Sequence, residues 1–436
     1  MGNKVAICFV FVLVAALSSQ AFAKSWDFNY RNLAQFRDGR NNDSQIPVNQ
    51  YISVGLSELP RNFSFQTDFR SFVDANNTAD DAFDLYQAAF HIDPVDIFSI
   101  DAGRMWFADG FDATLIDGAR FSLFPKSGYL GSSVYAGVPR FIETGDLFRL
   151  TEGLIVGTNL NLQNVKDTAA QLSAKWRKLD ATKNDYKEND TIYLGLTASH
   201  QFSNIGATPN IYGDFEYDLA GKTINAGTAG VNLYPHWRIA LTFEGNYFDV
   251  SRDSNETTIF GNYFSDELVQ GRQAAQIKLM KNLHLLEDVS YQHYRIGGLG
   301  NKNGYTAGGG LDYYWEKPKL SSTGEYYYRK SFGGNVHGGL LELVNKYFEK
   351  LVADLSFDVS RYSKITGQDG TATSLVGLLS YQIAKRSFLG IGGEYNHNNW
   401  FDREGRLTIN FEMGLDNTMY TPEKRSKKLN RRFHEI

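Results

Sequence analysis

The stretch RLTINFEMG, residues 406–414, alternates polar and apolar side chains without a break. In an extended chain successive side chains point to opposite faces, so this stretch has one apolar face and one polar face. The apolar positions are Leu407, Ile409, Phe411 and Met413, and the polar positions are Arg406, Thr408, Asn410 and Glu412. The pattern predicts a β-strand that separates an apolar environment from a polar one.

The same period of two recurs along most of the chain. Clear examples lie at residues 26–37, 63–73, 154–162, 170–177, 210–219, 238–247 and 351–360. Counting such segments predicts about 20–22 strands of roughly 9–13 residues, which is the length that crosses a bilayer as a tilted strand. More than half of the chain after residue 23 would then be strand, a share that is unusual for a soluble domain.

The predicted connections alternate between long and short. Long polar connections lie at 38–47, 74–81, 179–190 and 249–268, and short ones at 59–61, 93–96, 125–128, 234–236, 281–282, 316–319 and 384–386. The short segment 220–222, where a long loop is due, is an exception. An antiparallel membrane barrel has short turns on one side and longer loops on the other.

These patterns predict an all-β fold, a closed antiparallel transmembrane up-and-down β-barrel of about 20–22 strands. Closure is expected because every backbone N–H and C=O group in hydrocarbon needs a partner within the protein. The alternative is a soluble β-sandwich with the aromatic residues in its core. That alternative predicts recovery in a soluble fraction without detergent.

The two ends of the sequence differ from the barrel pattern. Residues 1–23 contain Lys4, an apolar run from Val5 to Leu17 and the cleavage pattern Ala21-Phe22-Ala23, which predict a cleaved secretory signal peptide. A short membrane anchor is the alternative. Residues 24–414 are then the barrel, with no N-terminal plug domain, and residues 415–436 are a basic periplasmic tail.

The only cysteine, Cys8, lies inside the predicted signal peptide. The exported chain would therefore contain no disulfide and no thiolate metal site. It would also lack the C-x-x-C-H motif that attaches c-type haem, so no cofactor bound by this chain is expected.

The final strand resembles that of the bacterial outer-membrane β-barrel superfamily, which comprises porins and related channels. The resemblance rests on the overall pattern and on Gly405, Leu407, Ile409 and Phe411, since such barrels end in alternating apolar residues that close on an aromatic residue. This chain departs from the family by continuing past that strand. The resemblance implies a bacterial outer-membrane location, contact with outer-membrane lipid and recognition by the outer-membrane assembly machinery.

The polar face supplies the candidate pore lining, because rings of charged side chains determine the selectivity of pores. The candidates are Arg31, Arg70, Lys175, Arg177, Asp214, Glu216, Arg238, Glu244, Arg272, Lys278, Asp312, Glu325, Arg329, Asp354, Asp358, Glu394, Arg406 and Glu412. Acidic residues predominate after Asp288, which predicts a weak preference for cations. Interfacial aromatic candidates are Trp26, Trp176, Trp237, Trp315 and Tyr347.

Other candidate sites are weaker. Arg104 and Asp117 are expected on neighbouring strands, where they could pair on the lumen wall, and a purely structural pair is the favoured interpretation. No H-E-x-x-H motif is present, so no zinc site is expected, and no catalytic residue or enzymatic activity is predicted. The net charge of −5 does not indicate nucleic-acid binding.

The sequence therefore favours a porin-like channel that passes small hydrophilic solutes or ions. The alternative is a barrel that forms a sheath around a periplasmic multihaem cytochrome in a transmembrane electron conduit, the haem belonging entirely to that partner. A third hypothesis is a structural or adhesive barrel. Bilayer conductance and co-purification with a haem protein distinguish the three.

Overall fold

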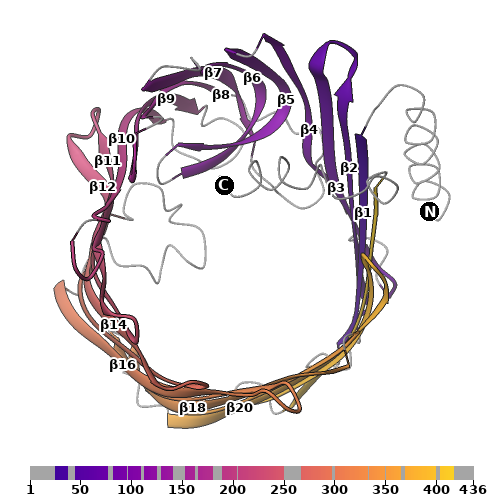
Figure 1. Cartoon of the computed structure of the whole chain (residues 1–436), viewed down its shortest axis with the longest axis vertical. Helices are drawn as coiled ribbons and strands as arrows, with labels where there is room; N and C mark the ends of the chain where they lie inside the picture. Colours follow the sequence, from indigo (N-terminus) through magenta and orange to yellow (C-terminus); the bar gives the residue numbers. More distant parts are fainter. Residues whose placement is uncertain are drawn as a thin grey trace.

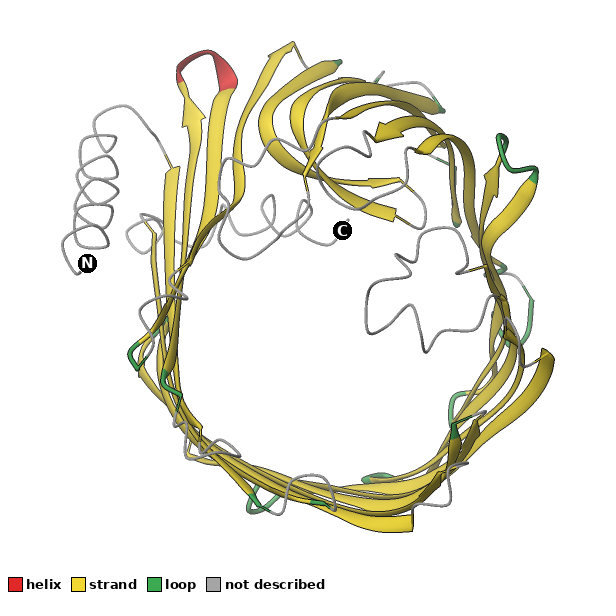
Figure 2. Ribbon diagram, turned by 180° about the vertical axis from the view of Figure 1, so that it is seen from behind, coloured by secondary structure: helices red, strands yellow, loops and turns green. Residues whose placement is uncertain are grey.

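The computed structural model is a single antiparallel sheet of 22 strands closed into a ring (Figure 1). It describes residues 25–37, 45–76, 82–95, 97–109, 112–124, 129–140, 153–162, 165–179, 189–203, 205–249, 267–296, 300–331, 333–348, 350–364, 369–398 and 403–416. Figure 2 shows the short 3₁₀ helix η1 (Pro60–Asn62) in red among the strands. Among the described residues, no helix is long and apolar enough to cross a membrane.

The strands follow one another around the ring in sequence order. They are β1 (Ser25–Arg37), β2 (Pro47–Leu59), β3 (Phe63–Asp74), β4 (Ala82–Val95), β5 (Phe98–Asp109), β6 (Asp112–Leu123), β7 (Leu130–Arg140), β8 (Gly153–Leu162), β9 (Thr168–Leu179), β10 (Asn189–Gln201), β11 (Asn210–Asp218), β12 (Thr223–His236), β13 (Ile239–Asp249), β14 (Glu267–Met280), β15 (Leu283–Ile296), β16 (Gly300–Trp315), β17 (Leu320–Ser331), β18 (Gly334–Phe348), β19 (Leu351–Lys364), β20 (Asp369–Ala384), β21 (Ser387–His397) and β22 (Glu404–Asp416). The predicted fold class, a closed up-and-down barrel of 20–22 strands, is confirmed.

The ring closes where β1 pairs with β22. The register runs from Asp27 opposite Asp416 to Arg37 opposite Arg406, so the ladder is continuous over the whole of the seam. The stretch predicted to close the barrel is thus the last strand. It extends to Asp416, two residues beyond the predicted boundary at Gly414.

An apolar cluster stabilises this seam. Phe28, Ile52, Val54 and Phe69 on β1–β3 are buried and pack against neighbours that include Met413 of β22. The rings of Tyr30 and Phe411 also approach to 6.2 Å across the seam. Packing and backbone hydrogen bonds therefore hold the first and last strands together.

The connections at the two ends of the barrel differ in length, as expected. At the end that carries both ends of the described chain, β12–β13, β14–β15, β18–β19 and β20–β21 are joined by two residues each. At the opposite end, 17 residues separate β13 from β14, but only two separate β5 from β6 and β17 from β18. β5 continues to Asp109 and β6 begins at Asp112.

Several sequence-based expectations fall outside the described residues. These are the signal peptide at 1–23 and all of the basic tail except Leu415 and Asp416, which belong to β22.

The seam gives a direct test of which face meets lipid. Ile409 is on the apolar face near the middle of β22, and its neighbour Thr408 is on the polar face. We expect Ile409→Lys to lower the free energy of unfolding by about 2–4 kcal/mol in phospholipid vesicles, because it places a charge in hydrocarbon. Urea titration followed by tryptophan fluorescence measures the change.

Thr408→Lys is the matched control, with an expected loss below about 1 kcal/mol because its side chain points to the other face. Equal losses for the two variants would contradict the assignment of the faces.

Candidate functional site

The residues proposed to line the pore lie, with one exception, on a single face of the sheet. Residues that stand opposite each other in adjacent strands share a face, and the register pairs Arg31 with Glu412, Glu244 with Arg272 and Glu394 with Arg406. Counting from such pairs places the following residues on this polar face: Arg31, Arg70, Lys175, Arg177, Asp214, Glu216, Glu244, Arg272, Lys278, Asp312, Glu325, Arg329, Asp354, Asp358, Glu394, Arg406 and Glu412. Arg238 instead lies in the turn between β12 and β13.

Two tyrosines show which way the polar face points. The Tyr212 ring of β11 lies across Gly230 of β12, where a side chain would collide with it. Its hydroxyl donates a hydrogen bond to Glu244 Oε2 of β13 at 2.7 Å. Side chains two strands apart converge in this way on the concave side of a curved sheet.

The second tyrosine repeats the arrangement. Tyr327 of β17 lies across Gly338 of β18, and its hydroxyl donates to Asp358 Oδ2 of β19 at 2.9 Å. On the opposite face, Tyr326, Gly309 and Glu287 stand in the same cross-strand order. Among the described contacts no hydrogen bond joins that tyrosine to that glutamate, and Tyr326 is 59% exposed. The polar face is therefore concave and forms the lumen wall.

Negative charge predominates on the lumen wall of β11–β22. The acidic side chains there are Asp214, Glu216, Asp218, Glu244, Asp288, Asp312, Glu325, Glu342, Asp354, Asp358, Glu394, Glu404, Glu412 and Asp416. The cationic ones that the register places there are Arg272, Lys278, Lys302, Arg329, Lys364 and Arg406. Two of these cations are already neutralised by lumen neighbours. Arg272 Nε donates to Asp288 Oδ2 at 2.7 Å, and Arg406 bonds Glu404 and Glu394.

The wall bends sharply inward at β5–β9 (Figure 1). Gly103, Gly118 and Gly137 stand opposite one another in β5, β6 and β7. Gly103 has a φ of +126°, which disfavours any other residue. A β-carbon at Gly118 would overlap the carbonyl oxygen of Ala136. This glycine row lets three strands bend together and approach closely.

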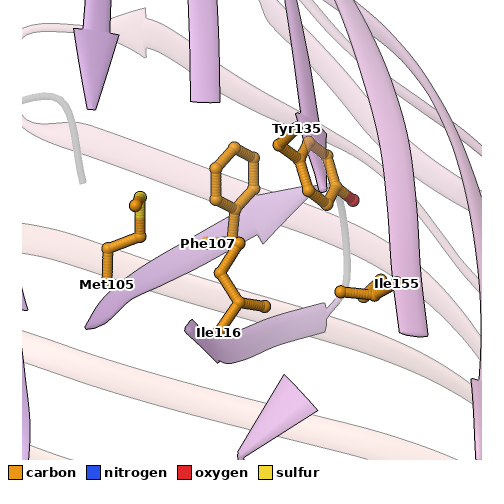
Figure 3. Close-up of a cluster of buried hydrophobic side chains, with 5 residues drawn as sticks. All are labelled: Met105, Phe107, Ile116, Tyr135 and Ile155. Carbon is orange, nitrogen blue, oxygen red and sulfur yellow. The ribbon is translucent and has the colours of Figure 1, made fainter. Parts of the chain in front are cut away.

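Beyond the glycine row, lumen-facing side chains pack against each other (Figure 3). Met105, Phe107, Ile116, Tyr135 and Ile155 are each at most 5% exposed. The Phe107 and Tyr135 rings stack with centroids 3.9 Å apart. This corner of the barrel is therefore filled by apolar side chains, in contrast to the charged wall of β11–β22.

The predicted pairing of Arg104 with Asp117 is confirmed, but its expected position on the lumen wall is wrong. Arg104 Nε donates to Asp117 Oδ1 at 2.7 Å, and Arg140 Nε donates to the other carboxylate oxygen at 2.6 Å. The register places all three on the face opposite to Met105 and Ile116. Mutual neutralisation, with both arginines at most 12% exposed, allows the cluster to stand on the outer side.

Lumen-facing polar side chains of β4–β6 and of β9–β10, next to this apolar corner, also form contacts with one another. Asp101 accepts from Arg120 Nε at 2.7 Å and contacts His91 Nδ1 at 2.7 Å. Further along, Lys175 is 4% exposed, with its ammonium 5.4 Å from the Tyr193 ring. The Tyr193 hydroxyl accepts a hydrogen bond from Arg177 at 3.1 Å.

Sequence reasoning did not identify the corner or these contacts. The signal that could have shown it is a glycine in each of three consecutive predicted strands, at positions that a correct register places side by side.

The interfacial aromatic candidates lie near strand ends. Trp26 is in β1 and Trp176 in β9, whereas Trp315 ends β16 and Trp237 lies in the turn after β12. Trp237 is 69% exposed, and its ring lies 4.6 Å from the Arg238 guanidinium and 5.2 Å from the Lys278 ammonium. Tyr347 belongs to β18, and its side chain is outside the described part.

One ion pair joins two adjacent turns. Lys281 Nζ donates to Glu316 Oε1 at 2.6 Å. This hydrogen bond lowers the pKa of the Glu316 carboxyl and raises the pKa of Lys281. Both side chains are exposed, so the pair contributes little to stability. Within the described ranges, no group of three or more His, Cys, Asp or Glu side chains could hold a metal ion.

The buried cluster of Arg104, Arg140 and Asp117 should contribute far more to the free energy of unfolding than the exposed Arg272–Asp288 pair on the lumen wall. Asp117→Asn removes the charge that two poorly exposed guanidinium groups share, so we expect a loss of about 3 kcal/mol in the free energy of unfolding. Urea titration in vesicles measures it. Asp288→Asn breaks the Arg272 pair, whose partners are 41% and 42% exposed, and should cost at most about 1 kcal/mol. A larger loss for Asp288→Asn would refute this ranking.

Comparison with solved structures finds other barrels of similar extent. Pseudomonas aeruginosa OpdK with vanillate superposes with a TM-score of 0.45 at 8% sequence identity, covering 91% of this chain and 100% of the other. The P pilus usher PapC translocation pore gives 0.49 at 8% identity, with 89% and 99% covered. Acinetobacter baumannii OccAB4 gives 0.43 at 13% identity, with 90% and 98% covered. No protein-family model and no curated protein sequence matches the chain. These likenesses concern the β-barrel fold alone.

Proposed function

We propose that the protein is a bacterial outer-membrane channel that passes small hydrophilic solutes or ions and prefers cations. The observation that carries this proposal is the lumen wall of β11–β22, where carboxylates outnumber cationic side chains. Rings of acidic side chains favour cations in pores because they lower the electrostatic energy of a cation relative to an anion.

The width of the barrel supports a channel. Barrel diameter grows with strand number, and 16–18 strands already leave an aqueous passage. With 22 strands, this barrel is wider than those, even though its corner at β5–β9 is filled. Solutes would therefore pass along the acidic wall rather than beside Met105 and Phe107.

The cellular setting is part of the proposal. A signal peptide at residues 1–23 would direct export, and the assembly machinery would insert the barrel with its apolar face in lipid. An even number of strands returns both ends of the barrel to one side, so the tail after Asp416 would lie in the periplasm. No catalytic role is proposed for any residue of the lumen wall.

A sheath for a periplasmic multihaem cytochrome is the second candidate, and the width of the 22-stranded barrel is the observation that favours it. In that case the haem is supplied by the partner. Haem absorbance in the barrel purified from its native membrane would support the sheath over the channel.

The channel proposal is tested by planar-bilayer recording. We expect stepwise conductance and a reversal potential in a KCl gradient that indicates cation preference. The triple variant Glu325→Gln, Asp354→Asn, Asp358→Asn should shift that potential toward zero, because it removes three lumen charges. Glu287→Gln is the matched control: it removes a carboxylate from the outer face and should leave the potential unchanged.

Absence of conductance steps from folded protein would refute the channel. Steps with an anion preference, or equal shifts for the triple variant and Glu287→Gln, would refute the proposed role of the acidic wall.

A further inference from the structure

A pocket of about 430 Å³ lies on the lumen wall where β17–β20 reach the rim opposite to the two ends of the described chain. The register sets Arg329, Val336 and Tyr362 side by side in β17, β18 and β19, and all three line the pocket. Lys364 follows two residues after Tyr362 on the same face, nearer the rim. In Figure 1, β18 and β20 lie across the lumen from the filled corner at β5–β9. The pocket is therefore inside the barrel, near its mouth and away from that corner.

The lining of this pocket is cationic, in contrast to the acidic wall around it. Arg329 and Lys364 both line it, and no acidic side chain is among its described lining residues. The Arg329 side chain is exposed and forms no salt bridge within the described part of the chain. The Lys364 ammonium lies 6.0 Å from the centre of the Tyr362 ring. An anionic group that enters the pocket would therefore meet two cationic side chains and no carboxylate in the lining.

Uncharged hydrogen-bond donors complete the lining. The Tyr362 hydroxyl is buried and has no hydrogen-bond partner among the described residues. Such a hydroxyl is unfavourable, and an acceptor atom in the pocket would satisfy it. The side chains of Ser331, Ser360 and Asn398 also line the pocket. Charged and neutral donors around one space suit a ligand group with several acceptor oxygens.

Carboxylates begin just below the pocket. Asp358 precedes Ser360 by two residues on the lumen face of β19, which is a distance of about 7 Å along a strand. It accepts a hydrogen bond from the Tyr327 hydroxyl at 2.9 Å, and Glu325 of β17 belongs to the same cross-strand row. An anion held by Arg329 would therefore remain at the mouth, because the wall below it repels negative charge.

The volume and the charge of the pocket indicate the kind of anion. Pockets for small organic ligands begin at about 300 Å³, so this one has room for more than a bare ion. Val336, Ala372 and the Tyr362 ring give part of the lining an apolar surface against which a carbon skeleton can lie. A phosphate monoester has three strong acceptor oxygens and about −1.5 to −2 charges at neutral pH, so it suits two cations and several donors better than a carboxylate does.

We propose that this pocket of β17–β20 binds a phosphorylated sugar of monosaccharide size at the mouth of the barrel. The phosphate would accept hydrogen bonds from Arg329 and from the Tyr362 hydroxyl, and Lys364 would add positive charge. The sugar would lie against Val336 and Ala372. Binding itself does not require conduction, and only the part of the pocket in solute uptake rests on the proposed function, with this rim facing outward.

The test measures binding by isothermal titration calorimetry. The purified full chain is kept in a non-ionic detergent at low ionic strength and titrated with glucose 6-phosphate. Glucose and glucuronate are the comparison ligands, since the first lacks the anion and the second carries a carboxylate instead. We expect wild type to bind one glucose 6-phosphate per chain, to bind glucuronate about ten-fold more weakly and not to bind glucose measurably.

Variants with matched controls test the contacts. Arg329→Gln should weaken binding of glucose 6-phosphate about ten-fold, because it removes a charge-assisted hydrogen bond. Lys330→Gln removes the next charge in β17, which lies on the outer face, and should have no effect. Tyr362→Phe should weaken binding about five-fold. Ala372→Phe fills the pocket and should abolish binding, whereas Ala274→Phe adds the same ring to the lumen wall of β14 and should not change it.

No binding by wild type, equal affinities of the Arg329→Gln and Lys330→Gln variants, or full binding by Ala372→Phe would overturn the proposal. Equal affinity of wild type for glucuronate would also overturn it, in favour of a site for carboxylates. Each variant is first shown to be folded by circular dichroism. Bilayer conductance is recorded with the same preparations, so that absent conductance with intact binding refutes the proposed channel and not this site.

Discussion

The whole structure depends on the pairing of β1 with β22. In hydrocarbon, an unpaired backbone N–H or C=O group costs several kcal/mol, so a sheet with two free edges cannot remain in a bilayer. The continuous ladder from Asp27–Asp416 to Arg37–Arg406 removes both edges at once. Once the ring is closed, its inner and outer faces lie in different environments. The period of two in the sequence then determines, in every strand, which residues face which environment.

The placement of charge follows from those two environments. On the lumen side, charged side chains can be solvated by water, and even the paired Arg272 and Asp288 are each about two-fifths exposed. On the outer side of the corner, Arg104 and Arg140 share one carboxylate and are nearly buried. A charge on that face must bring its own partner, since hydrocarbon supplies none. The same residue types therefore have functional consequences on one face and structural ones on the other.

Much of the fold and of the lumen lining could be predicted from the sequence, because the alternation of polar and apolar residues indicates the face of the sheet on which each residue lies. The strand pattern, the closing strand and nearly all of the polar-face residues follow from parity within single strands. The position of Arg238 could not be predicted in this way. Arg238 lies in a turn, where successive side chains no longer alternate between the two faces. The bend at Gly103, Gly118 and Gly137 and the tyrosine contacts to Glu244 and Asp358 depend on register between strands. Register is determined by turn geometry and bulges, which alternation does not encode.

Glycine shows most clearly how curvature gives one residue several roles. On the concave side, Gly230 and Gly338 make room for a tyrosine ring to cross a strand and reach a carboxylate. At the corner, the absence of a β-carbon lets three backbones approach and bend. On the convex side, neighbouring side chains diverge, so no ring covers Gly377 and Gly393, and the missing volume remains as a groove. In such a wall, the space beside a glycine is thus filled by a protein side chain on the inner face and stays open on the outer face.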